Sequence, residues 1–118
     1  MHKEEIEKYD ELHSKLLSLK TDFQILSGKK PNDKVNEFKL SIINKVLNSI
    51  NELIGEYKPD SDFDAFNIDS LPSNSDVLMM MNLYLSAMHR FREANSIETP
   101  DTDWGFPSSK KEWKTDDD

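Results

Sequence analysis

Between Val77 and Met88, ten of twelve residues are apolar and four of them are methionine. A surface helix of a small globular protein needs only one apolar stripe, about three or four positions in every two turns. This segment is apolar on every side if it is helical. We therefore expect either the central helix of a bundle or a helix with one face reserved for a partner. The segment is shorter than the roughly 20 residues that cross a membrane.

Two further helices are predicted before this segment. From Leu12, apolar residues recur at alternating steps of four and three, as in a helix packed lengthwise on a neighbour, which predicts a helix over about residues 3–27. A second helix is predicted over residues 33–57 with two adjacent apolar stripes, so we expect it to contact two neighbours and to lie between the first and the third helix. These stripes are Val35, Phe38, Ile42, Val46, Ser49 and Leu53, and Leu40, Ile43, Leu47, Ile50, Ile54 and Tyr57.

A third helix is predicted over residues 76–95, because Ser73 and Asp76 have the spacing of a capping box. The first two helices are joined by a short linker, which favours an antiparallel helical hairpin. The fold class expected for residues 1–95 is therefore all-α, a three-helix bundle formed by this hairpin and the third, apolar helix. Residues 96–118 show no periodicity and are expected to form an extended C-terminal tail.

Negative charge is concentrated in two segments of the chain. The net charge is −8, yet residues 1–58 contain ten acidic residues and ten lysines. Residues 59–75 carry four aspartates without a lysine or arginine, and residues 96–118 carry seven acidic residues and three lysines. Direct nucleic-acid binding is not expected, since phosphates bind where cations gather. The acidic surface is assigned to Asp60, Asp62, Asp64, Asp101 and Asp103.

Motifs that carry catalysis or metal binding are missing from the sequence. The chain has no cysteine, no glycine-rich phosphate loop and no nucleophile motif, so we expect no enzyme and no cofactor. Asp60, Asp62 and Asp64 match the first ligands of an EF-hand loop, but Ala65 replaces its glycine and Leu71 its closing glutamate. No metal site is predicted, although cation binding at this loop is left open. The three histidines show no convincing ligand spacing.

Two segments are candidate docking surfaces. Methionine is favoured on adaptable binding surfaces, and acidic residues beside aromatic ones are typical of docking segments. The alternatives are that the third helix is buried core and that the tail folds back on the bundle. The predicted partner-binding residues are Met79, Met80, Leu83, Tyr84, Met88, Trp104, Phe106 and Trp113.

The sequence thus predicts a non-enzymatic acidic helical protein that binds another protein through helix 76–95, the 59–75 loop and the tail. Such a protein would act as an inhibitor, an immunity or antitoxin-type protein, or an assembly subunit, and its partner would present a basic or apolar surface. The alternatives are an acidic inhibitor that mimics nucleic acid, and a structural homo-oligomer. A charged N-terminal segment and the lack of cysteine predict a cytoplasmic, intracellular location without membrane contact. Frequent Lys, Asn, Asp and Ser favour a bacterial or phage source.

Overall fold

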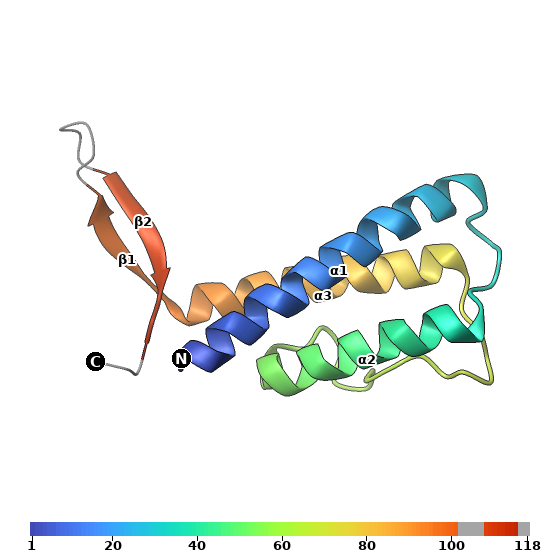
Figure 1. The fold of residues 1–118 in the computed structure, drawn as a ribbon, viewed down its shortest axis with the longest axis horizontal. Coiled ribbons are helices and arrows are strands. Elements are labelled where there is room, and N and C mark those ends of the chain that lie inside the picture. The colour runs from blue at the N-terminus through green and yellow to red at the C-terminus, as the bar shows by residue number, and fades with distance from the viewer. Residues whose placement is uncertain (102–107, 116–118) are drawn as a thin grey trace.

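The computed structural model describes residues 1–101 and 108–115 (Figure 1). The prediction of a mostly helical chain with three main helices is confirmed. Two C-terminal strands, which the sequence did not predict, follow the third helix. The elements in chain order are α1 (Lys3–Lys29), α2 (Glu37–Ile54), the short 3₁₀ helix η1 (Gly55–Tyr57), α3 (Asn74–Ala94), β1 (Ser96–Asp101) and β2 (Ser108–Trp113).

Helix α2 begins later than predicted. The side chain of Asn36 accepts a hydrogen bond from the backbone amide of Lys39 at 2.8 Å and so caps the helix, which starts at Glu37 rather than at residue 33. The preceding residue, Val35, lies outside the helix, and its amide donates to the carbonyl of Pro72 at 2.9 Å. A bond to a distant loop thus replaces the predicted first helical turn.

The ends of α2 and α3 follow local chemistry. Gly55 adopts a positive φ of 54° and ends α2, a conformation that costs glycine little. At the start of α3, the hydroxyl of Ser73 accepts from the amide of Asp76 at 3.2 Å, and the Asp76 carboxylate accepts from the amide of Ser73 at 3.4 Å. This is the capping box that the spacing predicts.

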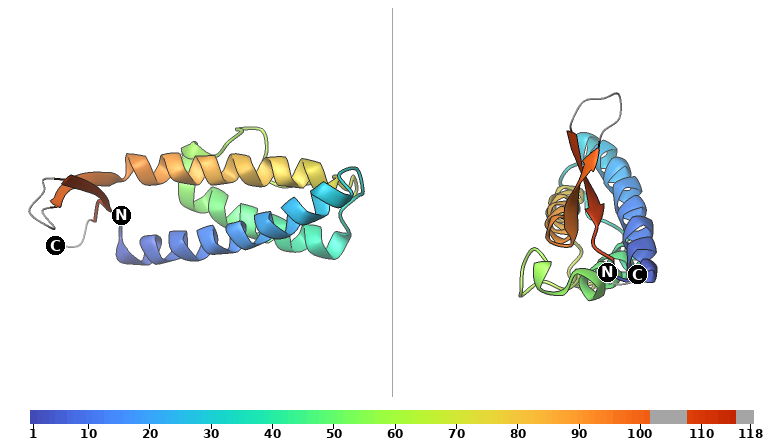
Figure 2. Two further views of the ribbon diagram at one scale, coloured as in Figure 1. Left: turned by 90° about the horizontal axis from the view of Figure 1, so that it is seen from above. Right: turned by 90° about the vertical axis from the view of Figure 1, so that its left-hand side faces the viewer.

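The longest contact between helices joins α1 and α3, which lie side by side (Figures 1 and 2). Both also contact α2, which is the shortest of the three helices. The expectation that the second helix lies between the first and the third is therefore wrong. Only one of the two apolar stripes of α2 is covered by the other helices along its whole length.

A single apolar core fills the space between the helices. It takes residues from all three helices, and Asn74 is the one polar residue buried with them in the described part of the chain. The side-chain amide of Asn74 donates a hydrogen bond to the carbonyl of Lys30 at 2.9 Å, so this buried polar group has a partner. The largest fully buried side chains are Leu16, Leu40, Ile43, Leu47, Ile50, Ile54, Val77, Met81, Tyr84 and Met88.

The loop between η1 and α3 is fastened along one side of α2. Asn44 makes two hydrogen bonds of 2.9 Å with the backbone of Phe66, one to the carbonyl and one from the amide. Asn51 donates to the carbonyl of Asp64 at 2.9 Å. The ring of Phe63 packs edge-on against Phe66 at a centroid distance of 5.1 Å. Two asparagines spaced seven residues apart on one helix face therefore determine where the acidic loop lies.

The tail forms an antiparallel hairpin, which corrects the prediction of an extended segment. Ser96 pairs with Trp113 and Asp101 with Ser108, so β1 and β2 are in register over six residues each. Pro100 lies within β1, as is tolerated in a two-stranded sheet where each strand has an open edge. The ladder is formed by backbone groups, and the residues of these strands do not alternate between apolar and polar, so periodicity gave no signal for it.

The base of the hairpin is attached to the bundle at one end, next to both α1 and α3. The amide of Lys114 donates to the carbonyl of Asn95 at 2.7 Å, just after α3. The N-terminal ammonium of Met1 donates to the carbonyl of Lys114 at 2.9 Å. The hairpin therefore projects from the end of the molecule where α1 begins and α3 ends (Figure 2).

Candidate functional site

Helix α3, the predicted docking helix, is mostly core. Tyr84 and Met88 are fully buried, so these two predicted partner-binding residues are corrected to core residues that a partner cannot reach in this conformation. Tyr84 is fixed further by a hydrogen bond of 2.7 Å from its hydroxyl to Oδ1 of Asn51, and burial raises its pKa. Met80 is half-buried against the core, whereas Met79 and Leu83 are exposed. The structure leaves one narrow apolar edge on α3 rather than a broad face.

The aspartates of the 59–75 loop are exposed, as an acidic surface requires. Asp60 accepts a hydrogen bond from the amide of Asp62 at 2.9 Å, which is a local turn contact. Asp64 forms an ion pair with Lys58. In the part of the chain that the structure describes, no three His, Asp or Glu side chains lie close enough together to hold a metal ion.

Trp113 is the one predicted tail anchor whose side chain the structure describes, and it packs on the bundle. Its ring meets Tyr9 edge-on at 4.8 Å between centroids and lies 6.3 Å from Phe91. The guanidinium carbon of Arg92 lies 5.3 Å from the centre of the same ring, within cation–π range. This contact agrees with the folded-back alternative for the end of the tail, and the assignment of Trp113 to a partner surface stays a prediction.

The other predicted tail residues cannot be compared with the structure. Asp103, Trp104 and Phe106 lie outside the described residues, and so does the side chain of Asp101 at the end of β1.

A histidine takes part in the aromatic cluster around Trp113. The ring of His13 stacks on Tyr9 with centroids 5.8 Å apart. Burial lowers the pKa of His13, and the nearby Arg92 lowers it further, against a smaller opposing effect of Asp10. Tyr9 is held in place by a hydrogen bond of 3.0 Å from its hydroxyl to the carbonyl of Met88. Protonation of His13 therefore acts on the contact between α1, α3 and the hairpin.

We expect acid to destabilise the wild type more than the variant His13→Gln. The pKa of His13 is lower in the folded state, so the unfolded chain binds a proton at a higher pH than the folded chain does. Neutral His13 therefore contributes fully to the free energy of unfolding only above the ordinary histidine pKa of about 6.5. This contribution is lost as the pH falls from about 6.5 through the lowered pKa of the folded state. Urea unfolding at pH 7.5 and at pH 5.5 measures the difference. An equal loss in both proteins would contradict the assignment.

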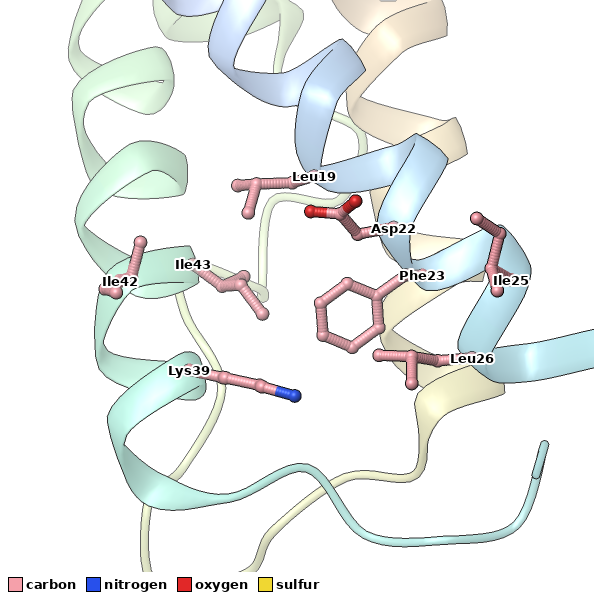
Figure 3. A pocket seen from close by; sticks show the side chains of 8 residues that line it. All are labelled: Leu19, Asp22, Phe23, Ile25, Leu26, Lys39, Ile42 and Ile43. Carbon is pink, nitrogen blue, oxygen red and sulfur yellow. The ribbon is translucent and has the colours of Figure 1, made fainter. Parts of the chain in front are cut away.

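An apolar depression in the described surface lies between α1 and α2, where the sequence predicted no site. It has a volume of about 380 Å³, and its walls carry aliphatic and aromatic side chains (Figure 3). We call it the α1–α2 groove and define it by Leu19, Asp22, Phe23, Ile25, Leu26, Lys39, Ile42 and Ile43. A second, shallower depression shares Leu19 and Ile42 and extends the groove toward Val46. The groove thus runs along both helices.

The outer side of the groove is rich in exposed apolar side chains. Phe38 is 75% exposed and lies one helical turn before Ile42, which lines the groove. Ile25 on the α1 wall is 56% exposed. Such side chains lose water contact only when something covers them, and exposed apolar side chains that gather around a depression are typical of interaction sites.

The sequence did contain a signal for this groove. Phe38, Ile42 and Val46 belong to the first of the two apolar stripes predicted for α2, and two stripes predict two neighbours for this helix. The structure buries the stripe that includes Leu40 and leaves Phe38 and Ile42 uncovered. Helix α2 has two neighbours within the chain, α1 and α3, and Phe38 and Ile42 are left for a further neighbour outside it.

Comparisons with known proteins give no relatives. No protein-family model matches the chain, and neither the curated proteins nor the solved structures contain a significant match. Among the helices of the described residues, none is both long and apolar enough to pass through a membrane. The function must be inferred from the surface itself.

Proposed function

We propose that this is a non-enzymatic protein-binding module whose docking site is the α1–α2 groove. The observation that carries the proposal is the partly uncovered stripe of α2 that begins at Val35, in which Phe38 and Ile42 are exposed beside an apolar depression. A partner that covers this apolar surface removes it from water, which stabilises the complex by about 25 cal/mol for each Å² of apolar area buried. We also propose that the protein works inside the cell, which agrees with its lack of cysteine.

A protein segment fits this groove better than a small molecule. Small-molecule sites enclose most of the ligand and place several polar groups around it. The α1–α2 groove is elongated, and Asp22 and Lys39 are the charged residues among its lining. Two helical walls with apolar side chains suit the apolar stripe of a further helix, which inserts side chains at helical spacing.

The groove replaces α3 as the main proposed docking surface. Met79 and Leu83 remain exposed one turn apart on α3, but they line none of the main depressions of the described surface, so the α3 edge has no second wall. A partner helix in the α1–α2 groove contacts two helices at once. A partner at the α3 edge contacts a single row of side chains and buries less apolar area.

Site-specific photocrosslinking in the cell tests this proposal. A photoreactive phenylalanine analogue placed at Phe38 or Ile42 is expected to form a covalent adduct with the docked chain on illumination. The same analogue at Gln24, an exposed α1 position outside the groove, is the matched control and is expected to form none. Adducts at Leu83 with none at Phe38 and Ile42 would return the docking site to α3 and overturn the proposal.

A further inference from the structure

The two walls of the α1–α2 groove carry opposite charges. Asp22 lies on the α1 wall and Lys39 on the α2 wall, and both side chains point into the groove (Figure 3). Among the residues that the structure describes, neither of the two forms an ion pair. A well-matched occupant therefore carries a cation where it meets α1 and an anion where it meets α2.

A second copy of the groove meets this requirement by symmetry. A two-fold axis that runs parallel to the groove, between the two copies, places the α2 wall of one copy over the α1 wall of the other. Lys39 of each copy then faces Asp22 of the other. One unpaired acid and one unpaired base in each chain thus give two ion pairs in a dimer.

The charge around the groove permits two copies to approach despite the net charge of −8. Residues 1–58, which form α1 and α2, contain equal numbers of acidic residues and lysines. The acidic loop is fastened to Asn44, two residues after Ile42, and at 3.6 residues per turn these two residues lie on opposite sides of α2. The loop's aspartates are therefore directed away from the groove.

Phe38 supplies the apolar anchor that such an interface needs. It is the most exposed of the large apolar residues in the described chain, and it lies beside its own groove rather than inside it. In the two-fold arrangement, Phe38 of each copy extends over the apolar surface of the other. Aromatic side chains buried at the centre of an interface contribute most of its binding energy.

We infer that the occupant of the α1–α2 groove is a second copy of this chain, docked about a two-fold axis with Asp22 of each copy against Lys39 of the other. This inference rests on the proposed function, because it identifies the partner of the same groove. It makes the protein a homodimer whose acidic loops and C-terminal hairpins lie outside the interface.

Sedimentation velocity of the full chain over a wide concentration range tests the inference with a charge-reversal pair. The wild type is expected to approach twice its monomer mass of 13.7 kDa. The variants D22K and K39D each place like charges in contact twice per dimer and should dimerise about tenfold more weakly.

Mixing D22K with K39D should recover the wild-type affinity. In the mixed dimer, the lysine introduced at position 22 of one copy faces the aspartate introduced at position 39 of the other. The native Lys39 of the first copy faces the native Asp22 of the second, so both contacts again join opposite charges. An intramolecular contact between the two positions would give no such recovery.

A second pair of variants locates the interface. Phe38→Ser is expected to weaken dimerisation about a hundredfold, whereas Leu83→Ser, which removes another exposed apolar residue from α3, should leave it unchanged. Circular dichroism checks that both variants fold. A wild type that stays monomeric at every concentration overturns the second copy as occupant. In that case the proposed function still stands if photocrosslinking at Phe38 gives adducts with another protein. If photocrosslinking gives no adducts, the proposed function fails together with the dimer.

Discussion

Replacing Tyr84 by alanine is expected to lower the free energy of unfolding by about 3–5 kcal/mol. Tyr84 is fully buried in α3, its ring meets Phe63 edge-on at 6.3 Å, and its hydroxyl donates to Asn51 at 2.7 Å. Alanine leaves a cavity beneath the 59–75 loop and removes the hydrogen bond. Urea unfolding followed by circular dichroism measures the loss.

Two further variants separate the contributions of Tyr84. Tyr84→Phe keeps the ring and removes only the hydrogen bond to Asn51, so we expect a loss of about 1 kcal/mol. Leu83→Ala, the neighbouring position on the exposed side of α3, should change stability by less than about 0.5 kcal/mol. If Tyr84→Ala is as mild as Leu83→Ala, α3 does not pack as described, and its apolar perimeter again becomes available to a partner.

The contrast between Tyr84 and Leu83 shows what the sequence could predict about α3. A segment with apolar residues on every side predicts a helix and its burial, and the capping residues Ser73 and Asp76 predict its start. It does not predict which side stays exposed, because Met79 and Met81 look alike in the sequence. That choice depends on where α1 and α2 lie, which is a tertiary property.

The groove illustrates a different limit of the sequence. Two apolar stripes on α2 predict two neighbours, and that physical argument still holds for Phe38 and Ile42. Both α1 and α3 contact α2, but their direct packing on each other leaves Phe38 and Ile42 exposed, although Val35 and Val46 of the same stripe are buried. Nothing in the spacing of the stripe distinguishes a neighbour within the chain from one outside it.

The hairpin shows a third limit. Its ladder pairs Ser96 with Trp113 through backbone groups that every residue carries, and the side-chain pattern of these strands has no period of two. From the sequence, the aromatic residues of the tail could either dock on a partner or fold back on the bundle. The ring contacts of Trp113 with Tyr9 and Phe91 show that the end of β2 lies on the bundle.

Replacing Trp113 by alanine is therefore expected to destabilise the isolated protein by about 2 kcal/mol. The indole is half-buried, and it makes ring contacts with Tyr9 and Phe91 together with a cation–π contact with Arg92. The backbone bond from the Lys114 amide to the Asn95 carbonyl is unaffected, so helix content should stay the same. Thermal and urea unfolding of the purified chain measure the loss.

Trp113→Phe is the matched control, because a smaller ring at the same position retains part of the packing on α1 and α3 and should recover about half of the stability. If the loss in free energy of unfolding is larger for Trp113→Ala than for Trp113→Phe, the Trp113 ring at the end of β2 is part of the folded bundle. If Trp113→Ala changes the free energy of unfolding by less than about 0.5 kcal/mol, the ring is not part of the fold. It would then be free to act as the docking anchor that the sequence predicted, and the tail would join the α1–α2 groove as a second binding surface.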